Sequence, residues 1–377
     1  MSFRFELTAR DGRARAGVFH TPRGPVETPV FMPVGTKATV KAMTPGEVKD
    51  LGASIVLSNT FHLWMRPGDE IVARLGGLHR FMNWHGPILT DSGGFQVWSL
   101  SKMRKINEEG AKFRSPIDGS PLHLTPEKAM AIQRNLGADI VMAFDECTEY
   151  PATLEHARAS AERTLRWAER CRAAHAEGGP VGGGGMQALF GIVQGGVHPE
   201  LRAWSATRTA ELDFPGNAIG GLSVGETKAE MEASLETVDA ILPEAKPRYL
   251  MGVGTPGDFF RGIERGVDMF DCVLPTRTAR TGRLYTAEGV LNIRNAFHAV
   301  DPAPVSASCA CDCCRNYSRA YLRHLFQCDE ILGARLATTH NLFYFLDLMA
   351  KIRVALNAGP GRLAELKREA LAAYAGT

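Results

Sequence analysis

Short apolar segments that end in polar or glycine residues recur along the chain. We count eight of them: TPVFMPV (28–34), ASIVLSNT (53–60), GPILTDSGG (86–94), ADIVMAFDE (138–146), ALFGIVQGG (188–196), NAIGGLSVG (217–225), RYLMGVG (248–254) and VDMFDCVLP (267–275). Because these segments are apolar throughout instead of alternating, they are typical of strands buried on both faces of a parallel sheet.

Helical patterns lie between several of these segments. The clearest are PEKAMAIQRNLG (126–137), LEHARASAERTLRWAERCRAA (154–174) and TKAEMEASLETVDAIL (227–242). Strand and helix alternating about eight times predicts an α/β fold, a (β/α)8 TIM barrel, with a doubly wound open sheet as the alternative.

The carboxyl ends of the predicted strands carry candidate chemistry. Asp91, Asp145, Gln194, Gly221 and Asp271 all stand where an apolar segment turns polar. Active sites of such barrels lie at this end of the strands. An aspartate after a strand is also a common N-cap for the next helix, but three aspartates, a glutamine and a diglycine at successive strand ends favour a shared site.

The pattern changes after residue 275. TRTARTGRLYTAEGVLNIRN (276–295) predicts hairpin strands, and a cysteine cluster and helices with the faces Leu322, Leu325, Phe326 and Leu342, Phe345, Leu346, Met349 follow. We therefore expect a barrel over residues 1–275, a zinc-binding subdomain over 276–345 and C-terminal helices that return to the barrel over 346–377.

Four of the eight cysteines crowd into CACDCC, as Cys309, Cys311, Cys313 and Cys314. Thiolates two and three residues apart can converge on a tetrahedral metal ion, and a structural zinc site closes with four ligands. The spacing leaves two triplets open, 309/311/313 and 309/311/314, with His324, Cys328 or His340 as the fourth ligand. Unrelated buried thiols are the alternative.

Composition narrows the class of protein. The 377 residues are 45% hydrophobic and 22% charged, with a formal net charge of +2, which is ordinary globular composition. No uncharged apolar stretch approaches the roughly 18 residues of a membrane span, and the first residues lack an apolar signal core. We expect a soluble, cytoplasmic protein with reduced thiols.

Seven motifs together resemble tRNA-guanine transglycosylase. They are DSGGFQ (91–96), FDECT (144–148), GIVQGG (191–196), GGLSVGE (220–226), YLMGVG (249–254), DCVLPTR (271–277) and the CxCxxC run with a later histidine. The resemblance implies a barrel with a zinc subdomain, an enzyme of queuosine biosynthesis that exchanges a guanine of tRNA for a 7-deazaguanine without ATP, and one structural Zn²⁺ per subunit on Cys309, Cys311, Cys314 and His340.

The resemblance also implies the catalytic roles. Asp271 is the expected nucleophile on C1′ of the ribose, and Asp91 the expected general acid/base. Breaking and remaking a glycosidic bond with retained configuration needs two displacements through a covalent intermediate. Retaining glycosidases hold their two carboxyls about 5 Å apart, and we expect a similar separation here.

Base recognition requires donors and acceptors opposite a purine edge. We expect Asp145 to accept from the ring N1–H and the exocyclic amine, and Gln194 and the Gly221 N–H to donate to the carbonyl oxygen. Phe95 and Met251 are expected to stack on the base, with ordinary core packing as the alternative.

The replacement base is expected to be preQ1, 7-aminomethyl-7-deazaguanine. Cys147 and Val224 match the bacterial members of the family, and a side chain as large as Val224 would exclude the bulkier queuine. The carbonyl of Leu222 could accept from the aminomethyl group. Queuine or preQ0, as used by eukaryotic and archaeal members, are the alternatives.

The expected polynucleotide is the anticodon loop of tRNA Asp, Asn, His and Tyr, read at the wobble guanine in a U-G-U context. Two basic groups are expected to contact it, unless they form only solvated faces: Arg277, Arg280 and Arg283, and Lys102, Arg104 and Lys105. Tyr317, Tyr321 and His324 fall on one stripe of a predicted helix. The resemblance implies that this stripe joins two subunits of a homodimer, and core packing is the alternative.

Two rival functions belong to other classes. A non-catalytic tRNA-binding paralogue would tolerate loss of the aspartates, yet Asp91, Asp145 and Asp271 are all present. A metal-dependent barrel hydrolase would need an HxH pair at the end of the first strand, where MPVGTK offers none.

Overall fold

The computed structural model describes residues 3–96 and 105–374, and its centre is a closed barrel of eight parallel strands. Neighbouring strands pair in the order β5–β6–β10–β11–β12–β13–β14–β4, and a parallel bridge between Val34 and Leu57 joins the two ends. The strands are β4 (Val30–Pro33), β5 (Val56–Ser58), β6 (Ile88–Thr90), β10 (Ile140–Met142), β11 (Ala188–Val193), β12 (Gly216–Ile219), β13 (Arg248–Leu250) and β14 (Met269–Cys272). Each lies in one of the eight apolar segments, so the predicted barrel is confirmed and the open sheet is wrong.

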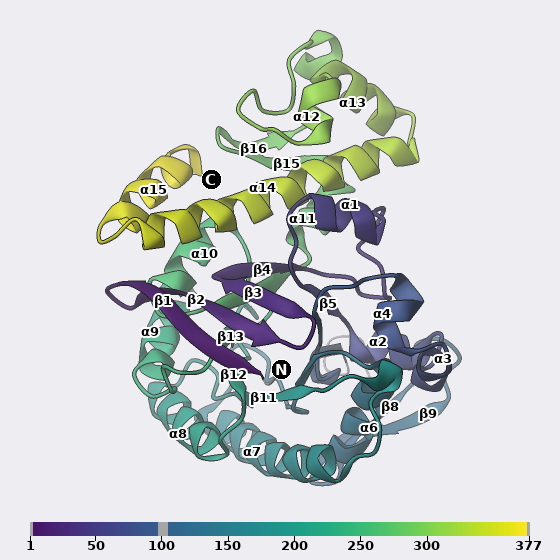
Figure 1. Cartoon of the computed structure of the whole chain (residues 1–377), viewed down its shortest axis with the longest axis vertical. Helices are drawn as coiled ribbons and strands as arrows, with labels where there is room; N and C mark the ends of the chain where they lie inside the picture. Colours follow the sequence, from purple (N-terminus) through teal and green to yellow (C-terminus); the bar gives the residue numbers. More distant parts are fainter. Residues whose placement is uncertain (1–2, 97–104, 375–377) are drawn as a thin grey trace.

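Helices cover the outside of the barrel, and Figure 1 shows α7, α8 and α9 following its curve. Threonine side chains begin five of them: each accepts a backbone N–H three residues on, which fixes the start of the helix. The helices before β14 are α1 (Pro45–Asp50), α2 (Thr60–Met65), α3 (Asp69–Arg74), α4 (Gly77–Met82), α6 (Pro126–Leu136), α7 (Leu154–Glu177), η1 (Gly182–Gly184), α8 (Pro199–Glu211), α9 (Lys228–Asp239) and α10 (Pro256–Ile263).

An antiparallel sheet that the sequence did not predict packs on the amino ends of the barrel strands. It consists of β1 (Arg4–Asp11), β2 (Ala14–Thr21) and β3 (Gly24–Thr28). Phe19 of β2 meets Phe190 of β11 edge to face, with ring centroids 5.7 Å apart. Phe5, Phe19 and Val26 thereby join the apolar interior of the barrel and cover its amino end.

A second unpredicted sheet stands between β6 and α6. Its strands are β7 (Lys105–Asn107), β8 (Gly110–Arg114) and β9 (Pro121–Leu124). The indole N–H of Trp167 on α7 donates to the Glu108 carbonyl at 2.9 Å, and the guanidinium of Arg170 donates to the same carbonyl at 2.7 Å. Helix α7 therefore holds the β7–β8 turn against the barrel.

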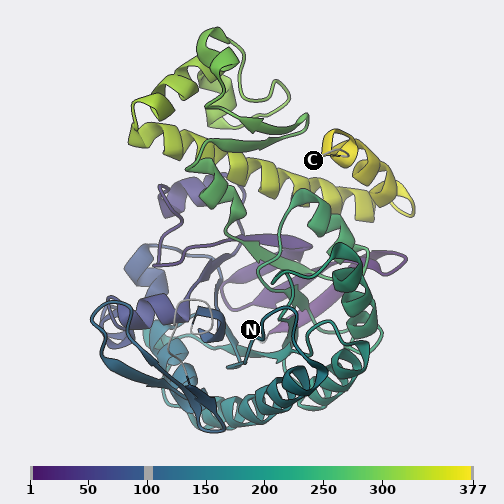
Figure 2. The same ribbon diagram turned by 180° about the vertical axis from the view of Figure 1, so that it is seen from behind.

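Of the chain after β14, the elements β15, β16, α12 and α13 lie on one side of the long helix α14, whereas α11 and the barrel lie on the other side (Figures 1 and 2). The predicted hairpin is present, but its expected start is wrong: residues 276–279 belong to a helix, because Pro275 suits its first turn. The elements are α11 (Leu274–Ala279), β15 (Arg283–Thr286), β16 (Gly289–Asn292), η2 (Ala296–Val300), α12 (Asp312–Asn316), α13 (Arg319–Gln327), α14 (Ile331–Asn357), α15 (Arg362–Leu371) and η3 (Ala372–Tyr374).

Helix α14 acts as the last helix of the barrel. Its Phe345 packs on Phe31 of β4, with ring centroids 5.4 Å apart. The expected boundary between residues 345 and 346 falls inside this helix, and the division into three regions stays a prediction. Of the helices in residues 3–96 and 105–374, none is both long and apolar enough to cross a membrane.

Candidate active site

A cavity of about 630 Å³ opens at the carboxyl ends of the barrel strands. Asp91 follows β6, Asp145 lies beyond β10, Gly221 follows β12, Met251 follows β13 and Asp271 belongs to β14. These strands are far apart in the sequence, yet the parallel barrel brings all their carboxyl ends to one side. The site residues that line the cavity are Asp91, Phe95, Asp145, Cys147, Gly221, Leu222, Val224, Met251, Asp271, Arg277 and Arg280.

Asp271 is buried and accepts two hydrogen bonds on the same oxygen. The Tyr249 hydroxyl and the Gly252 N–H both donate to its Oδ1 at 2.6 Å. No hydrogen bond to Oδ2 is found among the described residues. Burial raises the pKa of Asp271, and the two donors oppose that rise. The carboxylate is thus fixed through one oxygen while the other faces no donor.

Asp91 is held by the loop after β5. Its Oδ1 accepts the Thr60 N–H at 2.8 Å, at the start of α2, and its Oδ2 accepts from the Asn59 amide at 2.5 Å. Burial raises the pKa of Asp91 to about 6, the charge of Asp271 adds to the rise, and both hydrogen bonds oppose it. A carboxyl with a pKa near 6 can give and take a proton at neutral pH.

Asp145 lines the cavity and is hydrogen-bonded to two polar side chains. Ser92 donates to its Oδ1 and the Gln194 amide donates to its Oδ2, both at 2.7 Å. Gln194 itself is buried behind Asp145 and is not part of the cavity lining. Burial raises the pKa of Asp145. None of the three aspartates caps one of the helices with a described N-terminus, so the N-cap alternative is wrong for those helices.

The wall beside Asp145 is a glycine-rich turn after β12. Gly221 has φ +65°, and a Cβ there would lie 2.3 Å from Oε1 of Gln194, so only glycine fits. Glu226 fixes the next residues because its carboxylate accepts the backbone N–H groups of Ser223, at 2.5 Å, and Val224, at 3.0 Å.

Phe95 and Met251 both line the cavity. Phe95 is 48% exposed and Met251 is partly exposed, so ordinary core packing does not describe Phe95. Cys147 is buried, and its burial raises the pKa of the thiol to about 12. It is therefore a neutral thiol at physiological pH.

Basic side chains reach the cavity from two sides. Arg277 and Arg280 of the α11 region line it, whereas Arg283 is exposed on β15 and Lys105 is exposed on β7, and neither belongs to its lining. Lys102 and Arg104 lie outside the described residues. Lys41, His62 and Lys228, which the sequence did not single out, also line the cavity. The sequence feature that could have identified these three residues is their position, since each lies within four residues of a strand end or a helix start.

Tyr249 and Asn59 were also missed. Tyr249 stands inside an apolar strand, where its hydroxyl needs a partner, and Asn59 follows the second apolar segment directly. Both could have been found by asking where the polar atoms of buried strand residues go.

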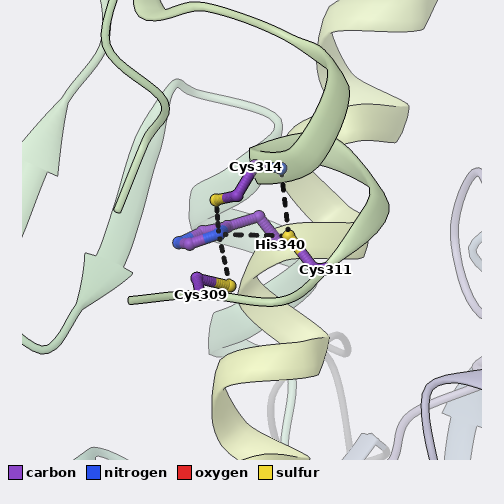
Figure 3. Close-up of side chains that lie close together, drawn as sticks. All are labelled: Cys309, Cys311, Cys314 and His340. Atoms are coloured by element: carbon purple, nitrogen blue, oxygen red, sulfur yellow. Dashed lines mark hydrogen bonds between the residues drawn. The ribbon is translucent and has the colours of Figure 1, made fainter. Parts of the chain in front are cut away.

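The candidate metal centre consists of Cys309, Cys311, Cys314 and His340, whose ligand atoms all lie within 4.8 Å of one another. Figure 3 shows the three sulfurs arranged around one nitrogen of the His340 imidazole. Nδ1 of His340 is 3.6 Å, 3.6 Å and 3.3 Å from the sulfurs of Cys309, Cys311 and Cys314. Cys313 is buried elsewhere, and Cys328 lies beside His324.

This arrangement fits a tetrahedral zinc ion. Bond lengths of about 2.3 Å to sulfur and about 2.0 Å to nitrogen give sulfur to nitrogen edges of about 3.5 Å, close to the separations above. Nε2 of His340 lies 2.8 Å from the Tyr285 carbonyl. A proton on Nε2 would donate to that carbonyl and leave Nδ1 free to bind the metal. With four protein ligands, the site leaves no position for a substrate.

The aromatic stripe differs from its prediction. Tyr317 lies between α12 and α13, and Tyr321 and His324 lie on α13, so the three are not on one helix. Their rings still form a row: Tyr317 and Tyr321 stack at 5.6 Å, and Tyr321 and His324 follow at 6.5 Å. Tyr321 is 40% exposed, which leaves this row open to a partner.

This chain is similar to known proteins over nearly its whole length. A family model described as queuine tRNA-ribosyltransferase matches residues 11–376. Proteins named queuine tRNA-ribosyltransferase are 55% identical in Thermoanaerobacter sp. (strain X514), covering 99% of this chain and 98% of the relative, and 58% identical in Symbiobacterium thermophilum, covering 95% and 89%. The protein of that name from Pelotomaculum thermopropionicum is 55% identical, with 100% of both chains covered.

Proposed function

The chain belongs to the queuine tRNA-ribosyltransferase family, and we propose that it is a tRNA-guanine transglycosylase, a pentosyltransferase that exchanges a guanine of tRNA for a 7-deazaguanine. The observation that carries this proposal is that two buried carboxyls, Asp91 and Asp271, line one cavity and differ in their partners. A retaining exchange of a base needs such a pair.

The proposed reaction gives each carboxylate oxygen of Asp271 a different role. Oδ2 of Asp271 attacks C1′ of the ribose, and the electron pair of the glycosidic bond leaves with guanine, which takes a proton from Asp91. An ester then joins Asp271 to the ribose, with Oδ1 as its carbonyl oxygen, still bound by Tyr249 and Gly252. The incoming base gives a proton to Asp91 and attacks C1′, and Asp271 departs as a carboxylate.

The polar groups on the cavity wall suit a guanine edge. Asp145 accepts from N1–H and the exocyclic amine, and the Gly221 N–H donates to the carbonyl oxygen. Gln194 donates one N–H to Asp145. Because it is not part of the cavity lining, its side chain must turn toward the cavity for the other N–H to reach the same carbonyl oxygen. Phe95 and Met251 cover the faces of the base. Donors from the base would stabilise the ionised form of Asp145, which burial disfavours.

The replacement base in this proposal is preQ1. Cys147, Leu222 and Val224 border the part of the cavity next to Gly221, and the Leu222 carbonyl accepts from the aminomethyl group. A user of queuine or preQ0 is the alternative within the family. Competition of preQ1, preQ0 and queuine against labelled guanine separates them: equal use of queuine contradicts the steric role of Val224.

The polynucleotide is the anticodon loop of tRNA Asp, Asn, His or Tyr, with the wobble guanine of U-G-U extruded into the cavity. Arg277 and Arg280 are the basic groups best placed for its phosphates, because they line the cavity. Arg283, Lys102, Arg104 and Lys105 stay predictions. Binding that does not weaken with salt would contradict phosphate contacts.

Zinc and a second subunit complete the proposal. One Zn²⁺ per subunit stabilises the region around α12, α13 and α14 without taking part in the chemistry. The row of Tyr317, Tyr321 and His324 joins two subunits of a homodimer in the cytoplasm. Metal analysis with less than one zinc per chain, or light scattering that shows only monomer at micromolar concentration, would contradict these two points separately.

The decisive experiment is incubation of the protein with undermodified tRNA and labelled guanine, or preQ1, without ATP. Exchange of the base into tRNA by the wild type, and none by Asp271→Asn, supports the function and the nucleophile together. A non-catalytic tRNA-binding paralogue, the second candidate, would bind the tRNA and exchange nothing.

A further inference from the structure

Arg202 of α8 is a fully buried arginine directly behind the cavity wall. Its guanidinium donates to four backbone carbonyls at the ends of β11 and β12: Val193 at 3.1 Å, Gly196 at 2.7 Å, Gly220 at 2.8 Å and Gly221 at 3.2 Å. The ion pairs found in residues 3–96 and 105–374 do not include Arg202.

The charge of Arg202 persists in this environment. Burial lowers its pKa to about 10, so the side chain is still protonated at neutral pH. A buried cation without an ion-pair partner costs free energy, and the fold offsets that cost with the four carbonyl dipoles and with the charge of Glu226. An apolar side chain would avoid the cost of the charge but would leave the four carbonyls without their donors, so the charged fork of N–H groups acts on these peptides.

One of the four carbonyls belongs to the peptide that faces the base site. The Gly220 carbonyl and the Gly221 N–H are two ends of a single peptide unit, and Gly220 and Gly221 line the cavity. A hydrogen bond to a carbonyl polarises its peptide, so that the N–H of that peptide becomes a stronger donor. No acceptor for the Gly221 N–H is found among the described residues, and Gly221 lines the cavity, so this N–H can donate to a ligand there.

We propose that Arg202 is a positioning residue for the purine carbonyl oxygen: it fixes and polarises the Gly220–Gly221 peptide, whose N–H donates to that oxygen. This rests on the function proposed above. When the bond between C1′ and the base breaks, its electron pair goes to the purine, and part of the negative charge reaches the carbonyl oxygen. A preorganised donor at that oxygen stabilises the departing base.

The test compares guanine with 6-thioguanine, which keeps the N1–H and the amine but replaces the oxygen with sulfur, a weaker acceptor. Dissociation constants are measured for wild type, Arg202→Lys and Arg208→Lys. Lysine keeps the charge but cannot present the planar fork of N–H donors. Arg208 is the matched control, because it is exposed on the same helix and pairs with Glu211.

We expect Arg202→Lys to weaken the binding of guanine by about tenfold and the binding of 6-thioguanine by less than about threefold. Arg208→Lys should change neither. In steady-state assays kcat should fall by about tenfold in Arg202→Lys while KM for tRNA stays within about twofold, because the proposed tRNA contacts are elsewhere. Arg202→Gln, which supplies two N–H donors without charge, should discriminate between the two bases still less than Arg202→Lys.

Equal weakening of both bases in both Arg202 variants would overturn the proposal and leave Arg202 a purely structural group, as would a change in KM for tRNA with kcat preserved. A wild type that binds neither base and exchanges none would instead contradict the proposed function. The wild-type measurement therefore separates the two failures.

Discussion

Strand β14 has a buried aspartate at each end, and the two carboxylates have different kinds of partner. At the amino end, Asp268 accepts a fork of two hydrogen bonds from Arg15, at 2.8 and 2.5 Å, and the Arg248 N–H at 2.7 Å. At the carboxyl end, the donors to Asp271 within the described part of the chain are the Tyr249 hydroxyl and the Gly252 N–H. The carboxylate of Asp268 therefore pairs with a cation, whereas that of Asp271 is hydrogen-bonded to neutral donors.

Strand β10 repeats this contrast. Before it, Asp139 lies 2.9 Å from His79 and 3.3 Å from Arg23, and it accepts the Ile88 N–H at 2.8 Å. Beyond it, Asp145 accepts from Ser92 and Gln194. The amino end of the barrel therefore pairs its buried acids with cations, whereas the carboxyl end leaves its acids with neutral donors. Burial raises the pKa of Asp268 as well as those of Asp145 and Asp271, so the two ends differ in the partners of their acids. Paired charges stabilise one end, and unpaired ones at the other leave a site ready for chemistry.

Asp271→Asn is the change with the largest expected effect. An amide cannot form the ester to C1′, so we expect base exchange to fall by about 10⁴-fold or more and the covalent tRNA adduct to disappear. The adduct is measured on a denaturing gel and the exchange with labelled guanine. The melting temperature should not fall, because an amide removes a buried charge that no cation compensates. An adduct that persists would move the nucleophile to another residue.

Asp268→Asn is the matching change at the other end of β14. It leaves Arg15 buried without its carboxylate, and breaking such a buried pair costs about 3–5 kcal/mol. We expect a large loss in the free energy of unfolding, measured with denaturant, and a kcat within about twofold of wild type in the folded fraction. A variant that is as stable as wild type but inactive would reverse the roles assigned to the two ends.

The sequence predicted the carboxyl end far better than the amino end. All eight barrel strands could be predicted because each is an uninterrupted apolar segment. Strands β1 to β3 could not, because their side chains alternate and include Arg4, Glu6 and Arg10, which is typical of a solvated surface. The partner of Arg15 is 253 residues away, and no local pattern connects them.

The part of the site that lies at strand ends could be predicted from the sequence. Asp91, Asp145, Gly221 and Asp271 follow apolar segments, so their convergence on one cavity follows from the barrel alone. The sequence could show that the Tyr249 hydroxyl needs a partner, but not that the partner is Asp271, because this contact depends on how β13 pairs with β14, where Tyr249 is opposite Met269. The expected start of the hairpin was wrong, because the threonine-rich residues at the end of α11 also suit strands.

The pH dependence of the first half-reaction tests the carboxyl end of the barrel through a smaller change in rate than the Asp271 substitution. Asp91 must be protonated to assist the departure of guanine, and its pKa is raised to about 6. Formation of the covalent intermediate should therefore fall about tenfold per unit as pH rises above 6, and should level off below it. Protonation of Asp271 would also stop its attack on C1′, so the rate should fall at a pH below the pKa of that carboxyl, which burial raises. Single-turnover rates between pH 5 and 9 test this, and a flat profile would contradict the role of Asp91.

Tyr249→Phe should have the smallest effect and is the most specific test of the carboxyl end. It removes one of the two donors on Oδ1 of Asp271. That donor lowers the pKa of Asp271, so its loss raises this pKa and moves the acidic limb of the rate profile to higher pH. At pH 8 we expect about a tenfold loss in exchange, the size of one hydrogen bond to a charged group.

The two halves of the reaction should respond differently to Tyr249→Phe. A carboxylate with one donor fewer is a stronger nucleophile and a poorer leaving group, so the second displacement should slow more than the first and the covalent adduct should accumulate. Tyr374→Phe is the control, because its hydroxyl donates to the Thr286 carbonyl, far from the cavity lining. Slower formation of the adduct without its accumulation would mean that Tyr249 orients Asp271 for attack and does not stabilise its departure.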